Sequence, residues 1–256
     1  MILKTDTYKW NMIEPHNGTD ISPFDHGSLT VLAARPGMGT TSLGAQITME
    51  LARKSGNEAL ILSLEEGAVS IYERMLGIPA PVAATSFQSR LFSPEEMALL
   101  EAASNRLKEL KITVEDSPLT EKQLLDRLER VEACGVVLID LSSELQKNLS
   151  SVFFSNLRYL ARRKGLPILV SLKLDRSLEK RRNKKPTVKD LKHTCKDTWG
   201  IDRYFLLYRE AYYTVGDVLQ EAELIYGEPE GTQKTLSLEW NSLCRYFSKG
   251  YVTIKD

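Results

Sequence analysis

A short glycine-rich turn between an apolar segment and a helical pattern has the residue types that bind phosphate. The apolar segment spans Leu29–Ala33, the turn contains Pro36, Gly37 and Gly39, and the helical pattern begins near Thr41. In this order of elements, successive backbone N–H groups and the N-terminus of a helix face an anion. The turn therefore predicts a phosphate-binding loop of the P-loop type.

The lysine of the P-loop signature G-x-x-x-x-G-K-[ST] is missing, and Thr40 occupies its position. Glycines and a helix start are enough to keep the shape of a phosphate cradle. A charge-assisted hydrogen bond is worth roughly 1.5–3 kcal/mol, so we expect triphosphate binding to be weaker by about 10- to 150-fold. The same cation also neutralises charge that develops on a transferred phosphoryl group. The alternative is that residues 35–39 form only a tight strand-to-helix turn.

The stretch Val136–Asp140 ends four apolar residues with an aspartate. At the carboxyl end of a buried strand, such a carboxylate lies within reach of a magnesium ion that bridges nucleotide phosphates. Many strands end in aspartate, but this one follows the glycine-rich turn by about 100 residues in an alternating chain. We therefore interpret Asp140 as a Walker B acid.

Short apolar runs alternate with amphipathic helical patterns over most of the chain. Such alternation is typical of an α/β fold with a mainly parallel, twisted sheet flanked by helices. From Arg203 onward, runs at 204–208, 221–226, 235–238 and 244–247 predict strands and hairpin turns, which would add an antiparallel C-terminal extension. No linker is found, so we expect an N-terminal arm over 1–27 and a single domain over 28–256.

Capping signals predict several helix ends. Gly56 is a C-cap for the helix that follows the glycine-rich turn. Ser93-Pro-Glu-Glu and Thr120-Glu-Lys-Gln have the pattern of capping boxes. They predict helices that run to about Leu110 and about Cys134.

Composition limits the classes of function. The 34 Lys and Arg residues balance 34 Asp and Glu residues, which excludes the globally basic surface of a dedicated DNA-binding module, so any nucleic-acid contact must be local. No apolar run of 18 residues and no signal-peptide pattern is found, so we expect no membrane partner and a cytoplasmic location. Cys134, Cys195 and Cys244 are scattered and are interpreted as reduced thiols.

The most basic window of the chain follows an apolar run at 167–172 that predicts a buried strand. Its cations are Lys173, Arg176, Lys180, Arg181, Arg182, Lys184 and Lys185. A basic loop at the end of a central strand suits contact with the phosphate backbone of nucleic acid. On charge alone, a solvated surface loop is the alternative.

Several stretches resemble the C-terminal RecA-like motor domain of the DnaB replicative helicases. They are Leu-Thr-Val-Leu-Ala-Ala-Arg-Pro-Gly-Met-Gly at 29–39, Ile-Leu-Ser-Leu-Glu at 61–65, Val-Leu-Ile-Asp at 137–140, Leu-Asp-Arg-Ser-Leu-Glu-Lys-Arg at 174–181, Lys-Pro-Thr-Val-Lys-Asp-Leu-Lys at 185–192 and Leu-Leu-Tyr-Arg-Glu at 206–210. The resemblance runs in unbroken order from about residue 18. It implies a RecA-like P-loop NTPase fold.

The resemblance also implies roles for individual residues. Glu65 would activate the attacking water, and Asp140 and Thr41 would hold Mg²⁺. The basic segment would match a loop that faces single-stranded DNA in the central channel of a hexamer, with Arg176, Lys180, Arg181, Arg182, Lys184 and Lys185 as the contacts. The residues that would wrap the phosphates of ATP are Arg35, Pro36, Gly37, Met38, Gly39, Thr40, Thr41 and Ser42.

Departures from the family pattern fall on the catalytic positions. Thr40 replaces the lysine, and Lys173 occupies the position of a glutamine that senses the γ-phosphate. At 227–231, where the family carries a lysine and an arginine that reach into a neighbour's site, this chain reads Gly-Glu-Pro-Glu-Gly. The segment after Asp140 is short, and the family's N-terminal helical collar has no counterpart in these residues.

Three functions follow from these patterns. The first, which the departures favour, is a DnaB-like protein of DNA replication or DNA binding, with weak ATP and Mg²⁺ binding and impaired or absent hydrolysis. It would act by binding single-stranded DNA, a replicative helicase or its own copies. The second is an active ATP-dependent helicase motor in which another cation, such as that of Lys173, substitutes for the lysine. The third is a RecA-fold interaction protein that binds neither nucleotide nor DNA.

Overall fold

A ten-stranded sheet forms the centre of the protein, in the order β10-β8-β7-β6-β1-β5-β4-β2-β3, with β9 paired to β8. The computed structural model describes residues 24, 26–132, 134–195, 198–213, 219–248 and 252–253. The N-terminal arm expected over 1–27 lies outside the described residues, apart from Phe24, His26 and Gly27. The strands are β1 (Leu29–Ala34), β2 (Ala59–Ser63), β3 (Ile112–Glu115), β4 (Val136–Asp140), β5 (Ile168–Lys173), β6 (Arg203–Tyr208), β7 (Leu219–Gly227), β8 (Gln233–Asn241), β9 (Tyr246–Ser248) and β10 (Val252–Thr253).

Helices and two short 3₁₀ turns connect these strands. They are α1 (Thr40–Ser55), α2 (Ala68–Gly77), α3 (Ala84–Ser89), α4 (Pro94–Glu109), α5 (Glu121–Glu129), α6 (Ser143–Asn148), α7 (Phe153–Lys164) and α8 (Val188–Thr194), with η1 (Arg176–Lys180) and η2 (Glu210–Tyr212). Among the described helices, none combines the length and the apolar composition needed to cross a membrane.

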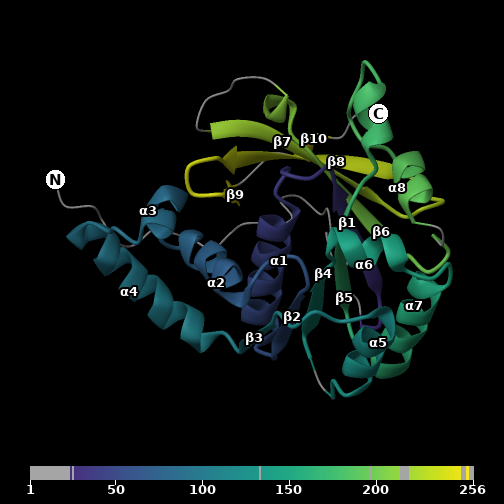
Figure 1. Cartoon of the computed structure of the whole chain (residues 1–256), viewed down its shortest axis with the longest axis horizontal. Coiled ribbons are helices and arrows are strands. Elements are labelled where there is room, and N and C mark those ends of the chain that lie inside the picture. Colours follow the sequence, from purple (N-terminus) through teal and green to yellow (C-terminus); the bar gives the residue numbers. More distant parts are fainter. Residues whose placement is uncertain are drawn as a thin grey trace.

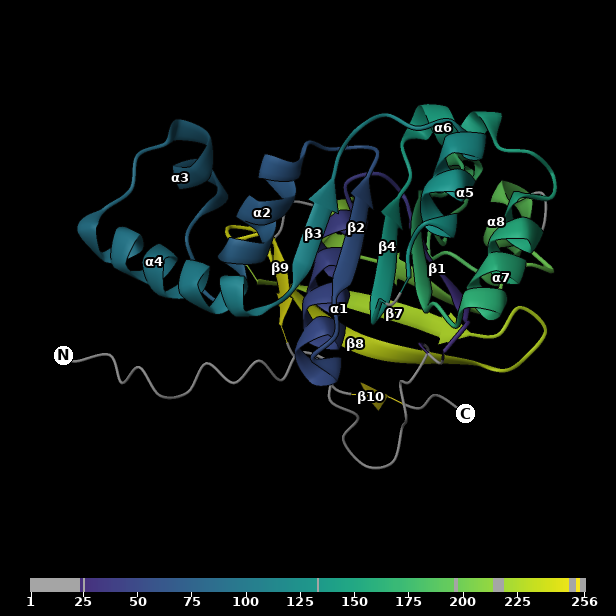
Figure 2. The same cartoon turned by 90° about the horizontal axis from the view of Figure 1, so that it is seen from below.

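Six neighbouring strands, from β6 to β3 in the sheet order, pair in parallel. The C-terminal strands β7 to β10 pair antiparallel. The predicted fold class, a mainly parallel sheet with an antiparallel extension, is therefore confirmed. In Figure 2, β7 and β8 cross the molecule at a large angle to β2, β3 and β4, as the twist of a wide sheet requires.

Helices cover both faces of the parallel strands (Figure 1). On one face, α5 and α7 contribute Leu124 and Leu157 to the core. On the other face, α1 and α2 contribute Leu43 and Ile71. Because both faces are buried, the strands are almost continuously apolar, and all six residues of β1 are buried.

The carboxyl ends of β1, β5 and β4 lie at one edge of the sheet. Ala34 at the end of β1 is in register with Lys173 of β5, and Ser171 of β5 is in register with Asp140 of β4. Side chains that follow or end these strands are therefore brought together, although they are far apart in the sequence.

The antiparallel extension is fixed to the helix behind the glycine-rich turn. Gln46 of α1 is buried, and its side-chain amide both donates to and accepts from the backbone of Phe247, at 2.9 Å each. Phe247 and Trp240 have ring centroids 4.6 Å apart and join the core on the α1 face. This contact makes the C-terminal strands part of the wall around the turn.

Local signals predicted helix ends better than the connections between elements. Ser93 and Thr120 form the predicted capping boxes, and Gly56 is the left-handed C-cap of α1. The helix predicted to reach Cys134 was too long, because the backbone turns after α5 ends at Glu129. The strand predicted over 244–247 begins later, at β9, because β8 continues to residue 241 and a turn follows. The patterns did not predict α2, α3, α6 or α8.

Candidate nucleotide-binding site

The bend between β1 and α1 needs its two glycines. Gly37 and Gly39 have φ angles of 82° and 102°, which residues with a side chain rarely adopt. A β-carbon on Gly37 would lie 2.8 Å from the ring of Tyr212. A β-carbon on Gly39 would lie 3.1 Å from the rings of Phe247 and Trp240. The bend is therefore held tightly between the backbone of the parallel strands and the aromatic side chains of the C-terminal part of the chain.

The helix after the bend keeps free N–H groups at its start. The Met38 N–H donates to the Arg35 carbonyl at 3.2 Å, and the first bond of α1 runs from Leu43 N–H to the Gly39 carbonyl at 2.9 Å. No side chain caps this helix, and among the described residues the N–H groups of 40–42 have no protein acceptor. Unpaired N–H groups at a helix start are what binds an anion in a P-loop.

The predicted phosphate-wrapping residues differ in what their side chains do. Arg35 is 8% exposed and donates to Glu179 at 2.8 Å and to the Leu174 carbonyl at 2.5 Å, so its guanidinium is committed to the protein. The Met38 side chain is buried in the core, whereas Pro36 and Gly37 are exposed. Their assignment to phosphate binding therefore concerns the backbone, and it stays a prediction.

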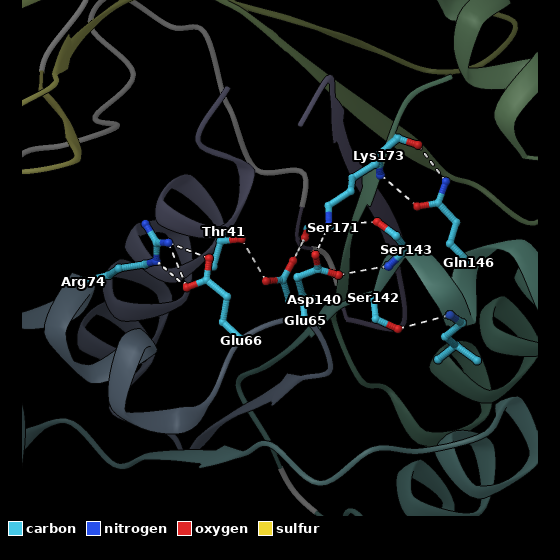
Figure 3. Close-up of polar contacts among 11 residues, drawn as sticks. Thr41, Glu65, Glu66, Arg74, Asp140, Ser142, Ser143, Gln146, Ser171 and Lys173 are labelled. Carbon is cyan, nitrogen blue, oxygen red and sulfur yellow. Dashed lines mark hydrogen bonds and ion pairs between the residues drawn. The ribbon is translucent and has the colours of Figure 1, made fainter. Parts of the chain in front are cut away.

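Thr41 and Asp140 meet across β5. The Thr41 hydroxyl donates to Asp140 Oδ2 at 2.9 Å, and the Ser171 hydroxyl donates to Asp140 Oδ1 (Figure 3). Asp140 is 3% exposed. The structure thus brings together the two residues that the sequence assigned to magnesium. The sequence did not single out Ser171, although a serine inside the apolar run 167–172 was a visible signal.

Burial raises the pKa of the Asp140 carboxyl above its ordinary value, while hydrogen bonds from Ser171 and Thr41 oppose that rise. The negative charges of Glu66 and Glu65 add to it. A buried carboxylate beside a hydroxyl, with no cation paired to it in the described structure, is a donor set that suits Mg²⁺, which prefers oxygen ligands. Within the described ranges, no group of three or more His, Cys, Asp or Glu side chains is arranged to hold a metal ion. Mg²⁺ that is bound with phosphates usually takes only one or two carboxylates from a protein.

Glu65, the residue assigned to water activation, is held on both carboxylate oxygens. Lys173 forms an ion pair with Oε1, and the Ser143 N–H donates to Oε2 at 2.9 Å. Lys173 also donates to the Ser143 hydroxyl at 3.0 Å. Gln146 fixes the backbone of Lys173 through bonds of 2.7 and 2.9 Å. The ammonium of Lys173 is therefore paired with Glu65, the carboxylate assigned to activate water.

The neighbouring Glu66 pairs with a second cation on the other side of Thr41. Arg74 of α2 holds both Glu66 oxygens, with contacts of 2.5 to 3.0 Å, and donates to the Ser42 hydroxyl at 3.0 Å. Figure 3 shows Thr41 and Asp140 between the Glu66–Arg74 pair and Lys173. The sequence did not single out Arg74, because its helix was not predicted.

The six basic residues assigned to DNA fall into two groups, those that contact another side chain and those that are exposed without an ion pair to a described residue. Arg181 pairs with Asp190 at 2.9 Å, and Lys185 pairs with Glu223 at 2.6 Å. Lys184 lies 4.4 Å from the centroid of the Tyr213 ring. The other three, Arg176, Lys180 and Arg182, are exposed and have no ion-pair partner among the described residues.

Replacing the buried acid tests its environment. At neutral pH the ionised Asp140 destabilises the folded state because its folded-state pKa is raised, so Asp140→Asn should raise the melting temperature, by about 2–4 °C for each kcal/mol relieved. The gain should shrink as the pH falls through the raised pKa toward 3.8, because the wild-type carboxyl then becomes neutral. Thermal unfolding between pH 8 and pH 4 measures both effects.

The matched control is Asp175→Asn. Hydrogen bonds from the backbone and side chain of Ser177 lower the pKa of Asp175, so its removal should bring no gain in melting temperature at neutral pH. A lower melting temperature for Asp140→Asn at pH 7, or a change that does not depend on pH, would contradict the burial argument.

Comparison with known proteins places this geometry in a family. The family model for the DnaB-like helicase C terminal domain matches residues 19–249. The replicative DNA helicase DnaB of Geobacillus stearothermophilus is 27% identical over 205 residues, which cover 75% of this chain and 45% of that protein. DnaB of Buchnera aphidicola subsp. Baizongia pistaciae is 28% identical over 243 residues, covering 87% and 52%. The chain spans about half the length of these curated relatives.

Solved structures agree on the fold. A structure described as an ATPase domain superimposes with a TM-score of 0.76 at 21% identity, covering 88% of this chain and 86% of that chain. A DnaB-like replicative helicase, solved in a study of its interactions with primase, gives a TM-score of 0.74 at 19% identity, covering 88% and 58%. These likenesses confirm the RecA-like fold. Since the family model covers most of the sequence in the order of the predicted motifs, the chain belongs to the DnaB-like helicase C-terminal domain family.

Proposed function

We propose that this chain is a DnaB-type domain that binds a nucleoside triphosphate and Mg²⁺ weakly, hydrolyses ATP slowly or not at all, and acts by binding. The observation that carries the proposal is the combination of an intact Thr41–Asp140 contact with Thr40 in the position of the lysine. The contact keeps the shape of a nucleotide site, while the substitution removes the charge that tightens phosphate binding.

The position of Lys173 supports impaired hydrolysis. A carboxylate that activates water accepts the proton of that water on one of its oxygens. Both oxygens of Glu65 already accept, from Lys173 and from the Ser143 N–H, so an attacking water would share an oxygen with one of these donors. Lys173 itself is not free to act as the substitute cation while Glu65 holds it.

Thr41 and Asp140 are the residues that would hold Mg²⁺, which would neutralise charge on the phosphates when bound. The protein's own part is then to position the ion. The Thr41 hydroxyl and the buried Asp140 carboxylate face each other, and Ser171 fixes the second carboxylate oxygen. The free N–H groups at the start of α1 would hold the phosphate oxygens beside them.

Single-stranded DNA is the proposed partner of the basic segment, which follows β5 at the same edge of the sheet as the nucleotide site. The relatives named above are replicative DNA helicases, which supports a role at a replication fork, either on DNA or beside a replicative helicase. Three exposed cations without acidic partners in the described structure, Arg176, Lys180 and Arg182, favour phosphate contact over a merely solvated loop. Self-association is the further binding mode that this proposal includes.

Impaired hydrolysis is tested by restoring the family's residues at positions 40 and 173. Wild-type turnover of Mg-ATP with single-stranded DNA should lie near background. The variant Thr40→Lys/Lys173→Gln should raise turnover at least about tenfold, because it returns a cation to the loop and frees Glu65. Adding Glu65→Gln to that variant should abolish the gain. High wild-type turnover that Glu65→Gln abolishes would instead establish a working motor.

The DNA contact is tested by charge reversal at Arg182. Arg182→Glu should weaken the binding of labelled single-stranded DNA and reduce the slope of log affinity against log salt by about 0.7 or more. Lys108→Glu on α4, which changes the charge equally at an exposed position away from the basic segment, is the control. Fluorescence anisotropy at several salt concentrations gives both values. Equal binding by the two variants, or no wild-type binding at low salt, would exclude this partner.

A further inference from the structure

Arg209 is a buried cation that contacts the phosphate-binding loop. It follows β6, is 5% exposed, and donates to the Gly37 carbonyl at 2.6 Å. Its second polar contact is a bond of 3.3 Å to the Gln220 side chain. The guanidinium carbon lies 4.5 Å from the centroid of the Trp240 ring and 6.0 Å from that of Tyr212. Its Nε atom is buried and has no hydrogen-bond partner in the described structure.

Arg209 differs from the other cations around the site in having no carboxylate. Among the described residues, Arg35 pairs with Glu179, Arg74 with Glu66, and Lys173 with Glu65. Arg209 makes no such pair with a described residue. A buried charge without a partner is strongly destabilising, so proteins retain one where a charge is needed.

Burial lowers the pKa of Arg209 to about 10, and the guanidinium therefore stays charged at neutral pH. Aromatic rings on its faces offset part of the desolvation, but they leave its net charge in place. The positive charge is thus held in a poorly solvated position, against the carbonyl of the glycine at the centre of the loop. In such a position a charge acts on nearby anions more strongly than it would in water.

We propose that Arg209 supplies, from behind the loop, the positive charge that the loop lacks at position 40, and that the phosphate chain of a bound nucleotide is its missing counter-ion. This rests on the proposed function, because it assumes that the loop binds phosphate. Arg209 acts as a positioning residue: it fixes the Gly37 carbonyl and so the curvature of the loop, and its charge favours the anion on the other side. Weak nucleotide binding without a lysine then has a physical basis.

Calorimetry with Mg²⁺ and tripolyphosphate tests this on the full chain. Arg209→Gln keeps a hydrogen-bond donor for Gly37 but removes the charge. It should weaken binding by roughly tenfold, the interaction of two unit charges about 12 Å apart at an effective dielectric near 20. Arg209→Lys keeps the charge and should bind within about threefold of wild type. Lys108→Gln, which removes an exposed charge on α4, is the control and should change nothing.

Rescue separates charge from structure. Thr40→Lys should tighten binding by a larger factor in the Arg209→Gln background than in the wild-type background, because in Arg209→Gln it replaces a missing charge. A merely structural role of Arg209 would give the same factor in both backgrounds. Unchanged affinity in Arg209→Gln, or a tenfold loss in a folded Arg209→Lys, would overturn the inference while leaving the proposed function in place. If neither wild type nor Thr40→Lys binds tripolyphosphate, the proposed function fails and the inference with it. Should Arg209→Gln not fold, the Arg209→Lys result decides.

Discussion

The hydrogen bond between Thr41 and Asp140 is the contact on which the site depends. It joins the first turn of α1 to the tip of β4, although β5 lies between β4 and β1 in the sheet. It can form because β1 ends at Ala34, directly before the bend, and the bend brings the start of α1 back over the edge of the sheet. The two glycines allow that turn, and the rings of Tyr212, Trp240 and Phe247 support it from the other side. The antiparallel extension is therefore part of the wall around the proposed nucleotide site.

The proposed site keeps the shape of a phosphate-binding loop but has, among the described residues, no free cation in front of it. The loop, the free helix N–H groups and the buried acid are the parts of the proposed nucleotide site, yet Lys173 and Arg74 beside them are paired with the protein's own acids. Glu65 holds Lys173 and Glu66 holds Arg74, on either side of Thr41. Arg209, which is buried and contacts the loop through the Gly37 carbonyl, has no acidic partner among the described residues. Such an arrangement suits a domain that responds to nucleotide by binding it, without the turnover that drives a motor.

Patterns within a few residues predicted much of this structure. Apolar runs located β1, β4 and β5, and capping boxes located the starts of α4 and α5, because burial and capping are decided locally. The pairing of Thr41 with Asp140 was expected from motif spacing and family resemblance. The partners of Glu65 and Gly37 were not, because they come from distant parts of the chain: Arg209 is 172 residues from Gly37, and Lys173 is 108 residues from Glu65. Arg74, the partner of Glu66, lies close in the sequence but on a helix that the patterns did not predict. Charge counts also could not tell which basic residues of 174–185 pair with acids that approach from α8 and β7.

The central claim is that the bend is a phosphate site that has lost its cation and kept its form. Calorimetric titration of wild type and Thr40→Lys with Mg²⁺ and a non-hydrolysable ATP analogue tests it most directly. We expect weak binding by wild type and binding about 10- to 150-fold tighter by Thr40→Lys, the range that one charge-assisted hydrogen bond contributes. Equal affinities for the two proteins, or no binding by either, would contradict it.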